Sequence, residues 1–270
     1  MLKNNFKFAF TLAEVLITLG VIGVVAAMTI PVLVQNYQRH EYVTRLKKAY
    51  TTLNTGFQQI IINAGCEGEK DALECTGLFG SENSDYTLEN QTYRKNLANA
   101  IERTFKLTET KFCSEDDVSF DCTRTWKYLK GSLSTSSTWL KNKLIFKTAD
   151  GYMFTINTKL KCTSNPYNIS PKYTKDCAAI IVDTNGSRKP NQLGRDTFEI
   201  ALSQSGYLIP IVGTDYAYAK DGNLEQGLYW QNTPAQCGDK DKSLSQITAN
   251  VVSGANCLAR IMENGWIMDY

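Results

Sequence analysis

The segment from Phe10 to Val34 restricts the fold of this 270-residue chain more than any other. From Val15 to Val34 the side chains are almost all apolar, and no charged residue lies between Glu14 and Arg39. A helix that spans a membrane needs about 20 consecutive apolar residues. The sequence therefore predicts that residues 10–34 form a transmembrane helix behind a short polar segment, residues 1–9.

A single carboxylate, Glu14, stands at the start of this apolar segment. A charged side chain in a membrane helix costs roughly 2.5–3.5 kcal/mol at the helix centre. A nearby cation would offset that cost. Alternatively, the carboxylate lies at the level of the lipid headgroups, where the positive end of its own helix stabilises it.

The first 35 or so residues resemble the N-termini of the type IV pilins and type II secretion pseudopilins. The similarity consists of the order Phe-Thr-Leu-Ala-Glu at residues 10–14, a leader that carries Lys3 and Lys7, and the apolar helix that follows. Pro31 stands where helices of this family often have a proline. The residue before the cleavage site is usually Gly in the family and is Ala9 here.

This resemblance implies a processing site and an assembly site. Cleavage after Ala9 frees the amine of Phe10, which the family methylates. In a filament, Glu14 would pair with that amine on a neighbouring subunit, and Thr11 and Pro31 belong to the same assembly segment. The implied partners are like subunits, in a homo- or hetero-oligomer, a prepilin peptidase, an inner-membrane assembly platform and the membrane itself.

A secretory signal peptide is the alternative interpretation of this segment. The apolar core of a signal peptide is normally 7–15 residues long, which is shorter than this one. The pair Ala26-Ala27 is compatible with a cleavage site, but an acid at the head of the core fits a signal peptide badly.

A second helical segment is predicted from residue 35 to residue 64. Its apolar residues recur at steps of three and four, which is typical of an amphipathic helix with one buried face; they are Val43, Leu46, Tyr50, Leu53, Phe57, Ile60 and Ala64. Joined to the apolar segment, it would form a spine of about 55 residues, or ~80 Å, ended by Gly65.

Eight cysteines fall into four close pairs: Cys66 with Cys75, Cys113 with Cys122, Cys162 with Cys177, and Cys237 with Cys257. An even number in an exported chain favours disulfides. Pairing of neighbours is the simplest of 105 connectivities, and metal binding or free thiols are the alternatives. The sequence contains no Cys-x-x-Cys or Cys/His metal spacing.

Strand patterns are concentrated between residues 143 and 212. The predicted strands are Leu144 to Thr148, Tyr152 to Asn157, Ala178 to Val182, Phe198 to Leu202 and Tyr207 to Val212, with Asp150-Gly151 and Ser-Gln-Ser-Gly as hairpin turns. We therefore expect an α+β, pilin-like fold: a long N-terminal helix packed on an antiparallel sheet of about four or five strands, with disulfide-tied loops. Residues 65–142 are expected to form a variable insert with a helix from Leu88 to Phe105, and residues 213–270 a disulfide-tied C-terminal region.

The loop before the fourth predicted strand is rich in oxygen ligands. Its candidates for a structural calcium ion, which prefers six to eight oxygens, are Asp183, Asn185, Ser187, Asn191 and Asp196. The segment Asp-x-Asn-Gly-x-x-x-Pro-Asn-x-x-Gly-x-Asp-x-Phe also recurs in pilin-like proteins. The alternative is a turn in which backbone amides hold the two aspartates. No other cofactor is expected. The acidic loop between Cys113 and Cys122 is interpreted as solvated.

The charge balance argues against a nucleic-acid-binding protein, and the missing catalytic motifs argue against an enzyme. Without Lys3 and Lys7 the chain has 27 basic and 27 acidic side chains, so no nucleic-acid partner is expected. No nucleophile elbow, zinc motif, phosphate loop or His-based triad is present, which argues against an enzyme.

The leading hypothesis is a structural filament subunit. It would be held in the cytoplasmic membrane by one helix, with its C-terminal domain outside, and then enter a periplasmic or extracellular filament. A minor or tip subunit that acts as a tethered adhesive module is the alternative.

Overall fold

The computed structural model describes residues 11–79, 91–130, 140–164, 175–186, 188–210, 237, 254–255 and 257–270. The chain divides into two units, Met1–Glu41 and Tyr42–Tyr270. The second unit is referred to below as the head. Ala9, Phe10 and Ser187, which the sequence singled out, lie outside the described residues.

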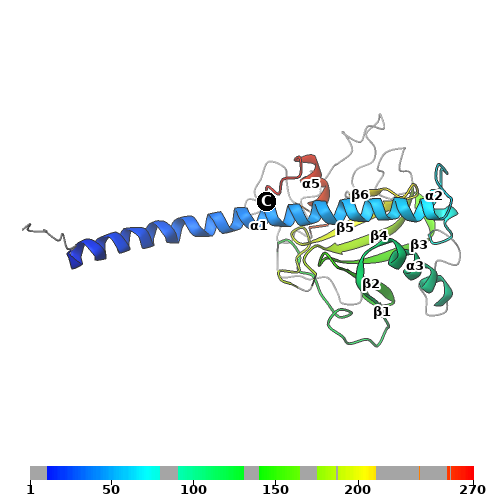
Figure 1. The fold of residues 1–270 in the computed structure, drawn as a ribbon, viewed down its shortest axis with the longest axis horizontal. Helices are drawn as coiled ribbons and strands as arrows, with labels where there is room; N and C mark the ends of the chain where they lie inside the picture. The colour runs from blue at the N-terminus through cyan, green and yellow to red at the C-terminus, as the bar shows by residue number, and fades with distance from the viewer. Residues whose placement is uncertain are drawn as a thin grey trace, which may run out of the picture. The chain divides into compact units, whose positions relative to one another are not determined.

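The long N-terminal helix is confirmed. Helix α1 (Leu12–Asn63) has 52 residues and continues through Pro31 (Figure 1). Gly65, just beyond its last residue, has a left-handed φ of 70°. The N–H of Cys66 reaches back to the carbonyl of Ile61 at 3.1 Å. This is the Schellman arrangement, in which glycine provides the left-handed residue that closes a helix.

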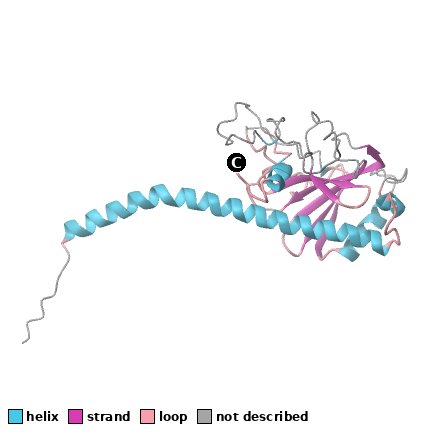
Figure 2. Ribbon diagram, turned by 90° about the horizontal axis from the view of Figure 1, so that it is seen from above, coloured by secondary structure: helices cyan, strands magenta, loops and turns pink. Residues whose placement is uncertain are grey.

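The described part of the head contains one antiparallel sheet, seen as a single layer in Figure 2. The spatial order of its strands equals their order in the sequence. They are β1 (Leu107–Cys113), β2 (Lys143–Thr148), β3 (Met153–Ser164), β4 (Lys175–Asp183), β5 (Thr197–Ser203) and β6 (Leu208–Pro210). The described helices of the head beside α1 are α2 (Ala72–Cys75), α3 (Gln91–Thr104) and α5 (Cys257–Glu263).

The expected count of four or five strands was wrong, because the sheet has six. The five predicted runs correspond to β2 through β6. The additional strand, β1, has the sequence LTETKFC and is an edge strand that pairs only with β2. Its polar residues do not alternate cleanly with apolar ones, so the period-two pattern that reveals half-buried strands is absent.

Two glycines close the two predicted hairpins in the same way. Gly151 (φ 84°) follows a turn in which its N–H donates to the carbonyl of Thr148, and Gly206 (φ 79°) donates to that of Ser203. Positive φ at this place matches the twist of the flanking strands. Gly206 also lies against α1, where an added Cβ would be 2.2 Å from Cδ1 of Ile61.

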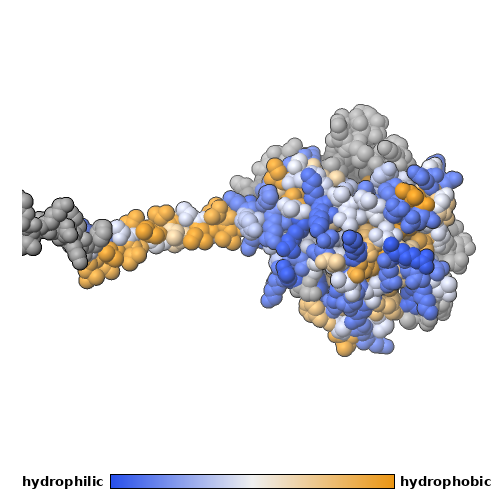
Figure 3. Space-filling model, in the orientation of Figure 1, coloured by the Kyte–Doolittle hydropathy of each residue, from blue (hydrophilic) through white to orange (hydrophobic). Residues whose placement is uncertain are grey.

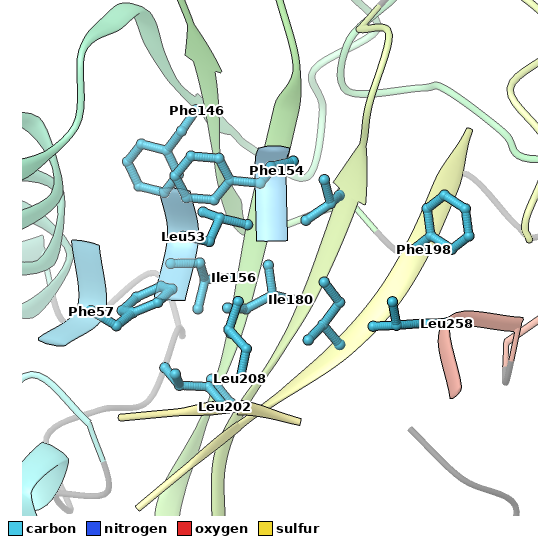
Figure 4. Packing of buried hydrophobic residues seen from close by; sticks show 14 of the residues in the cluster. Leu53, Phe57, Phe146, Phe154, Ile156, Ile180, Phe198, Leu202, Leu208 and Leu258 are labelled. Carbon is cyan, nitrogen blue, oxygen red and sulfur yellow. The ribbon is translucent and has the colours of Figure 1, made fainter. Parts of the chain in front are cut away.

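The main hydrophobic core lies between α1 and one face of the sheet. Its α1 residues are Val43, Leu46, Ala49, Leu53, Phe57, Ile60 and Ile61, which face Phe146, Phe154, Ile156 and Ile180 of the central strands (Figure 4). Five of the seven apolar residues predicted for this face are therefore buried, whereas Tyr50 is partly buried and Ala64 is exposed. Leu97 and Ile101 of α3 and Leu258 and Ile261 of α5 join the same core.

A second, smaller core covers part of the opposite face. Trp126 is fully buried there with Ile145, Met153 and Ile181, whose side chains leave the sheet on the side away from α1. The disulfide between Cys113 and Cys122 also belongs to this cluster. The segment after β1 thus packs against the sheet.

All eight cysteines are paired as sequence neighbours: Cys66–Cys75, Cys113–Cys122, Cys162–Cys177 and Cys237–Cys257. The disulfide prediction is confirmed, and the simplest connectivity is the observed one.

Candidate functional site

The start of α1 is a capping box built by Thr11 and Glu14. The N–H and the hydroxyl of Thr11 donate to Oε2 of Glu14, at 2.9 and 2.8 Å. In return, the N–H of Glu14 donates to the hydroxyl of Thr11 at 3.3 Å. Reciprocal bonds of this kind satisfy N–H groups that have no partner within the helix.

This geometry gives the Glu14 carboxylate a role inside its own chain. Both donors of Thr11 go to the same oxygen, and Oε1 takes part in none of these three bonds. The carboxylate also sits at the helix N-terminus, where a negative charge is favoured. It is exposed in the described structure, so a cation from another molecule can reach it.

The apolar half of α1 is uncovered within its own unit. Its large side chains are 42–77 % exposed from Leu12 to Val34, and they form a continuous hydrophobic surface (Figure 3). This helix is long and apolar enough to cross a membrane. Around Gly20 and Gly23 an added Cβ would meet no atom within 4 Å, so this face leaves room for close approach by another helix.

The second candidate, the loop around Asp183 and Asp196, is a buried polar network. Asp196 is fully buried and accepts hydrogen bonds from the N–H groups of Asn191 and Gln192, at 2.8 and 2.6 Å. The side-chain amide of Asn185 donates to it at 3.0 Å. Backbone and amide donors thus hold this carboxylate, as the turn alternative expected.

Asp183 is held by a cation that the sequence analysis missed. Nη1 of Arg124 lies 2.7 Å from Oδ2 of Asp183, and both side chains are buried. The same nitrogen donates to the carbonyl of Gly186 at 2.7 Å. Arg124 comes from the segment after β1, 59 residues earlier, so no local pattern could have identified the pair.

Burial dominates the electrostatics of this network. It raises the pKa of Asp183 to about 7, together with the neighbouring Asp196 carboxylate and against the guanidinium of Arg124. Burial also raises the pKa of Asp196, while the N–H groups of Gln192 and Asn191 act in the opposite direction. A carboxylate in a low-dielectric site is harder to ionise than one in water.

Calcium binding by this loop stays a prediction. Among the described residues no cluster of three or more His, Cys, Asp or Glu side chains is placed to hold a metal. Arg124 already supplies a positive charge to Asp183, and N–H donors occupy Asp196. These contacts favour a structural turn that fastens the end of β4 to the segment after β1.

The acidic loop between Cys113 and Cys122 is also anchored by basic residues. Nζ of Lys147 lies 2.8 Å from the carboxylate of Asp121, and Nζ of Lys111 lies 3.5 Å from that of Asp117. Hydrogen bonds to the carboxylates of Asp121 and, second, Glu109 raise the pKa of Lys147. Two of its carboxylates, Asp117 and Asp121, are therefore tied to β1 and β2. Glu115 and Asp116 are exposed, as expected of a solvated loop.

A groove of about 490 Å³ lies beside α1 in the head. It is lined largely by hydroxyl and amide side chains, including Thr51, Thr55, Gln59 and Tyr152. Burial raises the pKa of Tyr152 to about 12, so this phenol stays neutral. The only histidine of the chain, His40, is not part of this lining.

The candidate residues are divided between the two units of the chain. Thr11 and Glu14 belong to the first unit, and the aspartate network belongs to the head. The Thr-x-x-Glu spacing could have revealed the capping box from the sequence alone. No protein-family model, curated protein or solved structure matches this chain.

Proposed function

We propose that the chain is a structural subunit, a pilin or pseudopilin, of a type IV filament-type machine. The observation that carries this proposal is Glu14 at the head of an uncovered apolar helix, within the order Phe-Thr-Leu-Ala-Glu. The long helix and the antiparallel sheet are compatible with a pilin-like architecture. The proposed role is assembly, without catalysis.

In the proposed mechanism, one apolar surface is used twice. The uncovered half of α1 holds the subunit in the cytoplasmic membrane, with the head outside, and a prepilin peptidase removes residues 1–9. An assembly platform then transfers the helix from lipid into the filament, where other apolar helices replace the lipid. The amine of Phe10 on one subunit approaches Glu14 of the next and sets the register.

The capping box supports this mechanism energetically. Thr11 donates two hydrogen bonds to the carboxylate before any partner arrives, which lowers the cost of holding Glu14 near lipid. Because Oε1 is outside these bonds, an incoming amine does not have to break them. The cap and the intersubunit pair can therefore coexist.

Two substitutions test separately the hydrogen bonds of the capping box and the negative charge of Glu14. Glu14→Gln keeps a side chain that can serve a capping box but has no charge, so we expect normal membrane insertion and a loss of polymer incorporation. Thr11→Val keeps the carboxylate and removes the hydroxyl, so we expect incorporation to persist. Incorporation is measured as the fraction of protein in sheared or pelleted polymer.

Mass spectrometry of the mature N-terminus is the control in each strain. Loss of nine residues with addition of a methyl group shows that the substitution left processing intact. If Glu14→Gln enters polymer as well as the unsubstituted chain, the charge pairing is wrong. An N-terminus beyond Ala27 would instead support a signal peptide.

A further inference from the structure

Among the described residues of the head, the loop between Cys113 and Cys122 presents the most exposed large apolar side chain. Val118 is 86 % exposed and Phe120 is 60 % exposed. The two acids Glu115 and Asp116 are exposed beside them. We call Val118, Phe120, Glu115 and Asp116 the loop tip. Exposed apolar side chains that gather in one contiguous patch rimmed by polar residues mark a contact with another protein.

The loop tip is tied to the rest of the head by a disulfide and by a hydrogen bond. Its two ends are joined by the buried disulfide between Cys113 and Cys122. Between Val118 and Phe120, the hydroxyl of Ser119 accepts a hydrogen bond from Nζ of Lys111 at 2.5 Å. A surface that is already ordered loses little conformational entropy when it binds.

A second exposed apolar surface involves the C-terminal residues. Ile267 is 61 % exposed, and Trp266 next to it packs edge-on against Tyr50 of α1, with ring centroids 5.6 Å apart. The exposed Lys47 lies over the ring of Trp266 at 5.6 Å. We call Lys47, Tyr50, Trp266 and Ile267 the aromatic patch.

These two surfaces belong to opposite edges of the sheet. The loop tip follows β1 and is fixed to it through Lys111. The aromatic patch is connected to β6, because the hydroxyl of Tyr50 donates to the carbonyl of Leu208 at 2.7 Å. The strands β1 and β6 are the two edges of the sheet, labelled on opposite sides of it in Figure 1.

We propose that the loop tip of one head docks on the aromatic patch of a second copy of this chain. The two surfaces match in chemistry: Val118 and Phe120 meet Trp266 and Ile267, and the acids of the loop tip meet Lys47. A contact between two different surfaces of the same chain is heterologous, so it leaves a free surface at each end. Repetition of such a contact gives an open filament when the rotation between copies does not close into a ring. This inference rests on the proposed function and names a contact made by the heads, separate from the helices.

Photo-crosslinking of the full chain in its own membrane tests the contact. Benzoylphenylalanine replaces Phe120, and cross-linked peptides are identified by mass spectrometry. We expect a dimer whose cross-link maps to the segment from Asn264 to Tyr270 of a second copy. The matched control carries the same probe at Thr125, which is exposed on the same segment but outside the loop tip, and should not give this product.

A charge exchange tests the pairing of the acids with Lys47. The double substitution Glu115→Lys and Asp116→Lys should lower the cross-link yield by up to about fivefold, as expected for an exposed ion pair. Addition of Lys47→Glu should restore it. Non-reducing peptide mapping of the four disulfides in each variant checks that the head has folded.

Polymer is assayed in the same cells, so that the two proposals can fail separately. Polymer without the cross-link from residue 120 to 264–270 overturns this contact and leaves the filament function standing. The cross-link without polymer supports the contact and contradicts the filament function. A cross-link from residue 120 to a different protein, or to another surface of this chain, also overturns the contact.

Discussion

The carboxylate of Glu14 has two compatible roles at the level of the single residue. It accepts the N–H and hydroxyl of Thr11 within its own chain, and one of its oxygens is outside that cap. An acid at this position is therefore explained in part by helix formation alone. For this reason, the charge-free Gln variant tests assembly more sharply than Ala, which would remove cap and charge together.

Asp183 is expected to make the stability of the head depend on pH. Its pKa is about 7 in the folded chain, against 3.8 for an ordinary aspartate. Between these values the folded state keeps a proton that the unfolded state has lost. The free energy of unfolding should therefore fall as the pH rises from about 4 to about 7. Denaturant unfolding at a series of pH values measures this slope.

Asp183→Asn is the comparison for this measurement. The amide cannot ionise, so the slope should become shallower over the same range. It should not vanish, because burial also raises the pKa of Asp196 and of Glu199. A free energy of unfolding that rises between pH 4 and pH 7 in the unsubstituted chain would show that Arg124 outweighs burial at this site.

At the level of secondary-structure elements, the residue just after α3 packs against α1 at Gly56, which has no side chain. An added Cβ at Gly56 of α1 would lie 2.1 Å from Cζ of Phe105, a buried ring just after α3. The same ring packs edge-on against Phe57, with centroids 5.9 Å apart. The glycine therefore sets how closely this ring approaches the helix.

We expect Gly56→Ala to destabilise the head. Overpacking of a core typically costs 1–3 kcal/mol, whereas the better helix propensity of alanine returns about 1 kcal/mol. Thr55→Ala, at an exposed position on the same helix, is the matched control and should change stability by less than about 0.5 kcal/mol. Equal stabilities of the two variants, measured by denaturant unfolding, would mean that Phe105 moves away freely.

At the scale of the whole molecule, the head contains its own hydrophobic cores and disulfides, as an independently folding domain does. Both hydrophobic cores and all four disulfides lie within Tyr42–Tyr270. The first unit contains the uncovered apolar side chains from Leu12 to Val34. The physical requirements of the two units therefore differ: one needs an apolar surrounding, and the other supplies its own core.

A chain that lacks residues 1–41 should consequently fold and stay in solution without detergent. The full chain should remain with the membrane fraction. Circular dichroism during heating and non-reducing peptide mapping measure cooperative unfolding and disulfide pairing in the shortened chain. A shortened chain that melts without cooperativity, or that pairs its cysteines differently, would contradict an independent head.

The sequence by itself determined the features that depend on residues close together in the chain. These are the long helix, the glycine-closed hairpins, the five strands with an alternating pattern and the motif at residues 10–14, because periodicity and turn chemistry act over a few residues. Only the tertiary structure determined that residues 107–113 form the sixth strand, β1. Their polar sequence has no alternating pattern, and they become a strand by pairing with β2. The tertiary structure also decided which cation meets Asp183, since Arg124 lies 59 residues earlier in the chain and only the folded head brings the two side chains together.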